Sequence, residues 1–136
     1  MVKVLVAIRP EDEDVIHDVF SDEFEVVRCV TLAEAEAALS AEVAMIACGL
    51  HFDDGRMFDL LKMVKADPLL CAIPFWGILR DEGLLSTAIT RGIRTAMKSM
   101  GANGLFNLSQ LDTGGDASAA YRELRGAIQK SLAHGA

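Results

Sequence analysis

Apolar and polar positions fall in alternating blocks along the chain, and each block has the period of a strand or of a helix. Five mostly apolar runs predict strands buried on both faces, at residues 2–8, 24–30, 43–48, 72–79 and 104–108. Between these runs, apolar residues recur three and four positions apart, as they do in helices with one buried face. Strands that alternate with helices in this way predict a parallel sheet with right-handed crossovers.

Local signals mark where several helices begin and end. Pro10 opens the first helical pattern, and we expect the acidic run Glu11–Asp14 to lie on a solvated surface, where it complements the positive end of the helix dipole. Thr31 and Glu34 form a capping box, and Gly101 ends the fourth helix as a C-cap. That fourth helix is predicted to pack on the sheet through the series Leu85, Ile89, Ile93, Ala96 and Met100.

The order of these elements predicts one α/β domain over residues 1–136. We expect a flavodoxin-like (βα)5 three-layer sandwich with a parallel five-stranded sheet of order 2-1-3-4-5. In such a sheet, the functional crevice lies at the carboxyl ends of the first and third strands. Because the pattern ends with the fifth helix, we expect no output domain.

Composition excludes several classes of protein. Thirteen basic and twenty acidic residues give a net charge of −7, which argues against nucleic-acid binding. The longest apolar run near the N-terminus is too short for a signal peptide or a membrane span, so we expect a cytoplasmic protein without membrane contact. The three cysteines, Cys29, Cys48 and Cys71, lie in apolar runs, as expected of buried reduced thiols.

Three stretches resemble motifs of response-regulator receiver domains. They are "GLHFDDGRMFDLL" (49–61), "KADPLLCAIPFWGIL" (65–79) and "GANGLFNLS" (101–109). They resemble, in turn, D-L-x-L-P-D-G-x-x-x-D-L-L, K-x-D-P-x-x-x-x-I-P-V-I-x-L-T and G-A-x-D-Y-L-x-K-P of that family. The resemblance implies a phosphoryl acceptor aspartate after the third strand and a magnesium-binding acidic pair after the first. It also implies a Thr or Ser and a Lys that bind the phosphoryl group.

This chain differs from the family at each of those positions. The acceptor position falls on Gly49, the acidic pair on the stretch Ala7, Ile8 and Arg9, the Thr/Ser position on Leu79, and the Lys position on Leu108. The resemblance therefore implies a degenerate pseudo-receiver that lacks the phosphoacceptor aspartate. We expect a non-enzymatic signalling or adaptor protein of a two-component or related pathway, which needs no metal or cofactor and acts through protein–protein interaction.

Nearby residues leave alternatives open. Asp53 or Asp54 could serve as a displaced phosphate acceptor, or could form a turn with Gly55. Cys48 could sense oxidants, or could be inert packing.

A set of polar residues near the same crevice suggests a second function. The candidates for an anion-binding cleft are Arg9, His51, Arg80 and Asn107. In this alternative the protein is a sensor of a small anion or ligand. The two arginines could instead pair with Asp53, Asp54 or Asp81 as surface ion pairs.

The fourth helix carries a basic stripe on this acidic chain. Arg91, Arg94 and Lys98 recur at helical spacing, so they share one face. The family resemblance places partner and dimer contacts on the face formed by helix 4, strand 5 and helix 5. We therefore expect a protein partner or a homodimer there, unless the stripe is a solvated face.

Overall fold

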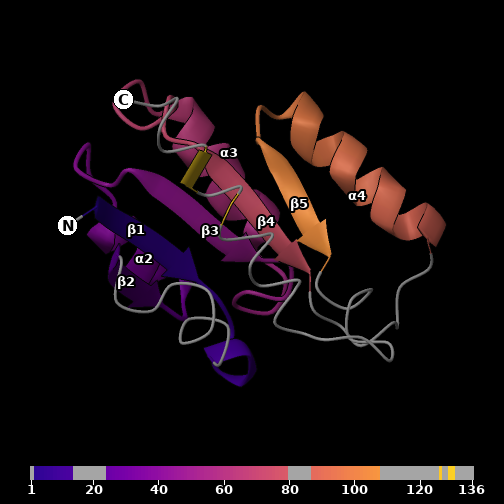
Figure 1. The fold of residues 1–136 in the computed structure, drawn as a ribbon, viewed down its shortest axis with the longest axis horizontal. Coiled ribbons are helices and arrows are strands. Elements are labelled where there is room, and N and C mark those ends of the chain that lie inside the picture. The colour runs from indigo at the N-terminus through magenta and orange to yellow at the C-terminus, as the bar shows by residue number, and fades with distance from the viewer. Residues whose placement is uncertain (1, 14–23, 80–86, 108–125, 127–128, 131–136) are drawn as a thin grey trace.

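Five parallel strands form one sheet. The computed structural model describes residues 2–13, 24–79, 87–107, 126 and 129–130. The strands are β1 (Val2–Ala7), β2 (Phe24–Cys29), β3 (Met45–Gly49), β4 (Phe75–Leu79) and β5 (Gly104–Asn107). Their order is β2-β1-β3-β4-β5, and every neighbouring pair is parallel (Figure 1). The predicted order 2-1-3-4-5 is confirmed.

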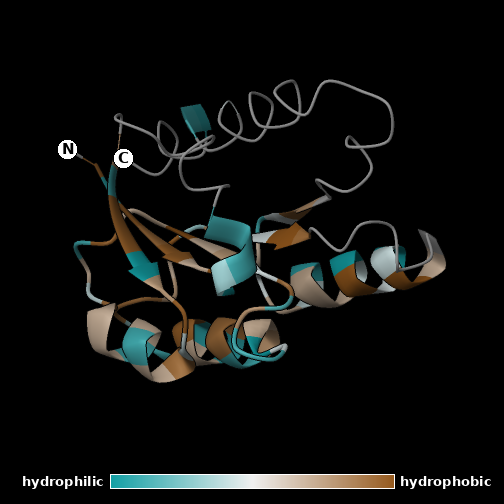
Figure 2. Ribbon diagram, turned by 90° about the horizontal axis from the view of Figure 1, so that it is seen from below, coloured by the Kyte–Doolittle hydropathy of each residue, from teal (hydrophilic) through white to brown (hydrophobic). Residues whose placement is uncertain are grey.

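Helices follow the strands as the sequence pattern predicts. They are the 3-10 helix η1 (Pro10–Asp12), α2 (Leu32–Ala38), α3 (Met57–Ala66) and α4 (Thr87–Ser99). Figure 2 shows α2, α3 and α4 on the same side of the sheet. Most of the first and fifth predicted helices lies outside the described residues. None of the described helices is long and apolar enough to cross a membrane.

The predicted helix ends are confirmed where the structure describes them. The Thr31 side chain accepts a hydrogen bond from the backbone N–H of Glu34, and the Glu34 carboxylate accepts one from the N–H of Thr31. Two donors at the start of α2 are thereby satisfied. At the other predicted end, Gly101 has φ of 95°, the left-handed conformation typical of a residue that terminates a helix.

Strand register determines where the loops converge. Four successive residues of β1, Val4 to Ala7, are fully buried, so both faces of this strand are shielded from water. Ala7 pairs with Cys29 of β2 on one side and with Cys48 of β3 on the other. The three strands therefore end at nearly the same level, and the loops that follow them meet at the carboxyl edge of the sheet.

The buried stripe of α4 differs from the predicted one. Ile89 is 52% exposed, whereas Thr90 and Met97 are buried and Ile93 is partly buried. Met97 packs over Gly77 of β4, where a Cβ atom would lie 2.6 Å from the Met97 Cε. The expected stripe is therefore wrong at Ile89 and Ala96, which are exposed, whereas Ile93 and Met100 pack against the core as expected. The helix turns Met97 toward the sheet, because this side chain fits above a glycine. Leu85 lies outside the described residues.

Candidate functional site

Apolar groups lie at the carboxyl ends of β1 and β3, at the positions that the receiver resemblance assigns to carboxylates. Ala7 and Cys48 are paired, so Ile8 and Gly49 both lie one residue further along. Ile8 is buried, and its Cγ2 lies 3.5 Å from the position of a Cβ atom built on Gly49. Leu79, at the end of β4, is also buried. Leu108 lies outside the described residues.

The backbone does not require a glycine at position 49. Gly49 is buried at the end of β3, and its φ lies outside the left-handed region. A Cβ atom there would make only ordinary van der Waals contacts, at 3.5 Å from Ile8 and 3.9 Å from the carbonyl oxygens of Ala7 and Ile78. The strand therefore has room for the first atom of a side chain at this position.

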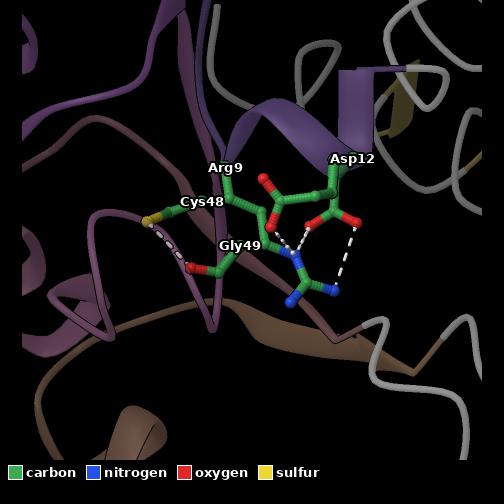
Figure 3. A network of polar contacts seen from close by, with 5 residues as sticks. Arg9, Asp12, Cys48 and Gly49 are labelled. Atoms are coloured by element: carbon green, nitrogen blue, oxygen red, sulfur yellow. Dashed lines mark hydrogen bonds and ion pairs between the residues drawn. The ribbon is translucent and has the colours of Figure 1, made fainter.

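Arg9 and Asp12 form an ion pair directly after β1. The Arg9 Nε donates a hydrogen bond of 2.8 Å to one oxygen of the Asp12 carboxylate, and Nη2 lies 3.5 Å from the other (Figure 3). The Asp12 side chain is 10% exposed and the Arg9 side chain 29%. Glu11 lies further away, with its carboxylate 3.9 Å from the Arg9 Nε. Arg9 thus interacts with carboxylates of its own loop.

The structure corrects the expectations about this loop in part. The acidic run was expected on a solvated surface; Glu11 and Glu13 are exposed, but Asp12 is buried, and Asp14 lies outside the described residues. Pairing of Arg9 with Asp53, Asp54 or Asp81 was one of two alternatives, and its ion pairs within the described residues are with Asp12 and Glu11. Asp81 lies outside the described residues, so pairing with it stays a prediction. The cause of the pairing with Asp12 is local, because a 3-10 helix has three residues per turn and brings residues three apart onto one side. Arg and Asp at that spacing around a proline are the sequence signal for this pair.

The loop after β3 is a turn anchored to α2. Asp53, Asp54 and Gly55 all have positive φ, at 45°, 57° and 88°. Asp and Gly tolerate this conformation better than other residues do, so the predicted turn is confirmed. The Asp53 carboxylate accepts a hydrogen bond of 2.9 Å from the backbone N–H of Leu32, at the start of α2. This contact gives Asp53 a structural role.

A cleft of about 440 Å³ opens between the loops after β1, β2 and β3. Its charged and titratable lining residues are Arg9, Glu11, His51, Asp53 and Asp54. The structure thus brings together Arg9 and His51 of the predicted anion cleft. Arg80 and the side chain of Asn107 lie outside the described residues. The carboxylates of Glu11, Asp53 and Asp54 line the same cleft, and Arg9 is already paired with Asp12, so the charges here favour pairing of Arg9 within the protein over binding of an anion.

Cys48 is shielded from reagents at this edge. It is fully buried, and its thiol donates a hydrogen bond of 3.5 Å to the carbonyl oxygen of Gly49. Burial raises the pKa of the Cys48 thiol well above its usual value of 9.0. The pKa of Cys29 is raised as well, by burial and then by the charge of Glu34. Both thiols therefore stay protonated near neutral pH, which favours the packing interpretation.

The described residues do not fit a bound metal ion. Within the described part of the chain, no group of three or more His, Cys, Asp or Glu side chains is placed to hold one. Magnesium prefers oxygen ligands, but Ile8 and Gly49 offer no side-chain oxygen at this edge, and Arg9 adds a positive charge.

The predicted basic stripe lies on an exposed face of α4. Arg91, Arg94 and Lys98 are all exposed. Gly92, on the same helix, is exposed too, and a Cβ atom there would have no neighbour within 4 Å. In the described structure this part of α4 is open to solvent.

Comparison with known proteins identifies the fold. The chain matches no protein-family model, and a search of curated proteins finds no match. Among solved structures, the phosphorylated cyanobacterial phytochrome response regulator RcpA matches with a TM-score of 0.72 and 19% identity, over 96% of this chain and 94% of that one. A CheY-like receiver domain from Methanospirillum hungatei JF-1 matches with a TM-score of 0.68 and 14% identity, over 99% and 96%. The non-phosphorylated HemR receiver domain from Leptospira biflexa gives 0.65 and 17%, over 97% and 94%. These likenesses show a receiver-type, flavodoxin-like fold.

Proposed function

We propose that this chain is a receiver-fold signalling protein that acts without phosphorylation, through contacts with other proteins. The observation that carries the proposal is Gly49, which has no side chain at the end of β3. Phosphoryl transfer to a receiver needs a carboxylate nucleophile, oxygen ligands for a hard cation and donors for the new dianion. At this edge the chain has Ile8, Arg9, Gly49 and Leu79 instead. The likeness to receiver domains supports a role in a two-component or related pathway of the cytoplasm, and supports a non-enzymatic one.

Treatment with a small phosphate donor tests the proposal. The protein is incubated with acetyl phosphate and magnesium, and separately with beryllium fluoride and magnesium, beside an active receiver domain as the positive control. We expect no increase in intact mass and no magnesium-dependent change in backbone NMR shifts around Gly49. A stable adduct on Asp53 or Asp54 would contradict the proposal, and loss of that adduct in Asp53→Asn or Asp54→Asn would identify the acceptor.

Gly49→Asp examines whether the missing carboxylate alone explains the loss. The fold has room for a Cβ atom at this position, so we expect the variant to fold. Its carboxylate would still lack a magnesium-binding acidic pair and a lysine, so a phosphoryl dianion would have too few counter-charges. We therefore expect no conformational response to beryllium fluoride. A response as large as that of the control receiver would show that other residues supply those roles.

The exposed basic stripe on α4 supports the second part of the proposal. Arg91, Arg94 and Lys98 create a local positive potential on a chain of net charge −7, and this potential favours an acidic protein surface. We place the partner on the face formed by α4, β5 and the fifth helix. A twofold homodimer centred on the stripe would bring like charges together, so a second copy fits only if it presents another, acidic surface.

Charge reversal on α4 tests this surface. Arg91→Glu/Arg94→Glu should weaken co-purification with partners from the native host and any self-association seen by sedimentation, because both depend on the positive potential. The wild-type association should weaken as salt rises through about 0.15 M. Lys62→Glu, a charge reversal at an exposed position of α3, is the matched control. The stripe would be ruled out as the partner surface if association weakened equally in the double variant and in Lys62→Glu. It would also be ruled out if the double variant kept its circular dichroism spectrum and lost no association.

A further inference from the structure

We infer that the Arg9 guanidinium, held by Asp12, is a built-in cation that replaces a bound metal ion at the carboxyl edge of the sheet. The inference deepens the proposed function and rests on it, because it names what keeps this edge in one state without phosphate or metal. It also attributes the poor fit of this edge to magnesium to two residues, Arg9 and Asp12.

The contact between the two side chains is close and largely buried. Two guanidinium nitrogens face the two Asp12 oxygens, at 2.8 Å and 3.5 Å. With its side chain only 10% exposed, Asp12 has lost most of its hydration, and a buried carboxylate needs a positive charge beside it. Arg9 supplies that charge from three residues away.

The backbone of four residues is sufficient to form the pair. Pro10 begins η1, and the N–H of Asp12 donates a hydrogen bond of 3.0 Å to the carbonyl oxygen of Arg9. Proline restricts φ to a value suited to the first helical position. This closed turn brings Asp12 back to the Arg9 side chain with no ligand required (Figure 3).

The Arg9–Asp12 pair also lies close to Gly49, the position that the receiver resemblance assigns to the phosphoryl acceptor. Arg9 directly follows Ile8, whose Cγ2 lies 3.5 Å from the place where a side chain on Gly49 would begin. A permanent positive charge at this point repels a divalent cation and offsets the charge of the Asp12 carboxylate. Removing the guanidinium should therefore expose a cation site that the wild-type protein does not offer.

Thermal unfolding of Arg9→Ala, Asp12→Asn and the double variant tests the inference. We expect each single variant to lower Tm by several degrees and the double variant to recover part of the loss, because it leaves no uncompensated charge. Guanidinium at about 20 mM, too dilute to denature, or Mn²⁺ should raise the Tm of Arg9→Ala. Neither should raise the Tm of the wild type or of the double variant. If Arg9→Ala is unfolded, its refolding by either cation counts as the rise, and Arg9→Gln provides the milder comparison.

The ion pair between Arg28 and Glu13 is the matched control. Both side chains are about half exposed, at 49% and 48%, so Arg28→Ala should change Tm little and show no rescue by cations. Single variants of the Arg9–Asp12 pair as stable as the wild type would overturn the inference. A folded Arg9→Ala that responds to neither cation, or an equal response in all variants, would overturn it as well. Phosphorylation of the wild type, in contrast, would overturn the proposed function and leave these stability results in place.

Discussion

Replacing Gly77 with alanine should show how tightly α4 is held against the sheet. A Cβ atom on Gly77 would lie 2.6 Å from the Met97 Cε and 2.8 Å from the Leu105 Cδ1, both far closer than van der Waals contact. Met97 is fully buried and Leu105 nearly so, which leaves neither side chain free to swing into solvent. Overpacking of this kind costs about 1–3 kcal/mol. At about 4 °C per kcal/mol, Tm should fall by roughly 4–12 °C.

Gly92→Ala is the control for this substitution. Gly92 lies within α4, is exposed, and has nothing within 4 Å of a built Cβ atom. Alanine in the interior of a helix is more stable than glycine by about 0.5–1 kcal/mol, so Tm should rise. Both substitutions replace glycine with alanine and so restrict the unfolded chain equally. The difference between their changes in Tm therefore reports interactions in the folded state.

Thermal unfolding followed by circular dichroism measures the Tm of both variants. Gly77→Ala should also cost much less when Met97 is shortened to alanine, because one of the two clashes is then removed. If Gly77→Ala were as stable as Gly92→Ala, the close packing of Met97 over β4 would be refuted. The exposure of the basic stripe depends on the orientation of α4, so it would then need an explanation other than the packing of Met97.

Three further outcomes follow from local geometry. Cys71 is exposed, contrary to the expectation that all three thiols are buried, so in the native protein Ellman's reagent should label only Cys71. Cys29 and Cys48, whose pKa values are raised by burial, should react only after unfolding. Backbone hydrogen bonds lower the pKa of Glu34 below 4.5, so its contribution to stability is present above that pH and is lost as pH falls. Glu34→Gln should therefore flatten the decline of the urea midpoint with pH in this range. At position 54, where φ is 57°, Asp54→Gly should be more stable to urea than Asp54→Ala by about 1 kcal/mol.

The sheet could be predicted from the sequence because its signals are local. A largely apolar run such as residues 2–8 is typical of a strand covered on both faces of a parallel sheet, and within it Val4 to Ile8 are buried. The observed strand order agrees with this prediction. The capping box at Thr31 and the helix end at Gly101 were equally predictable, since a few adjacent residues determine them.

The orientation of α4 could not be predicted in the same way. Its sequence contains two stripes at helical spacing, one through Ile89 and one through Thr90 and Met97. Choosing between them requires knowing that β4 presents a glycine beneath the helix, and Gly77 is distant in sequence from Met97. Long-range packing therefore buries Thr90 and Met97 and leaves Ile89 exposed, while Ile93 and Met100 of the predicted stripe still contact the core.

The candidate site shows a different limit of sequence reasoning. The resemblance to receiver motifs assigned carboxylate positions to Gly49 and to the stretch around Ile8. The structure places both residues at neighbouring strand ends, while their match to the family's positions stays a prediction. The resemblance did not identify Asp12, since a carboxylate in an acidic run is ordinarily solvated. Only the 3-10 turn, in which residues three apart share a side, makes Asp12 a buried partner of Arg9.

Charge balance at the end of β1 and the packing of α4 depend on different residues, Arg9 and Gly77. The pair of Arg9 with Asp12 balances charge at the end of β1, through contacts made within four residues of chain. Gly77 holds α4 by its fit to Met97, on a different strand and without any charged group. In a receiver that is switched by phosphate, an event at the strand ends must alter a distant surface, and this requires an element with two arrangements. Here the strand ends have their own counter-charge, and α4 has its own packing contact. A partner that binds the basic stripe therefore needs no event at the strand ends, which is the physical sense in which the proposed signalling is independent of phosphorylation.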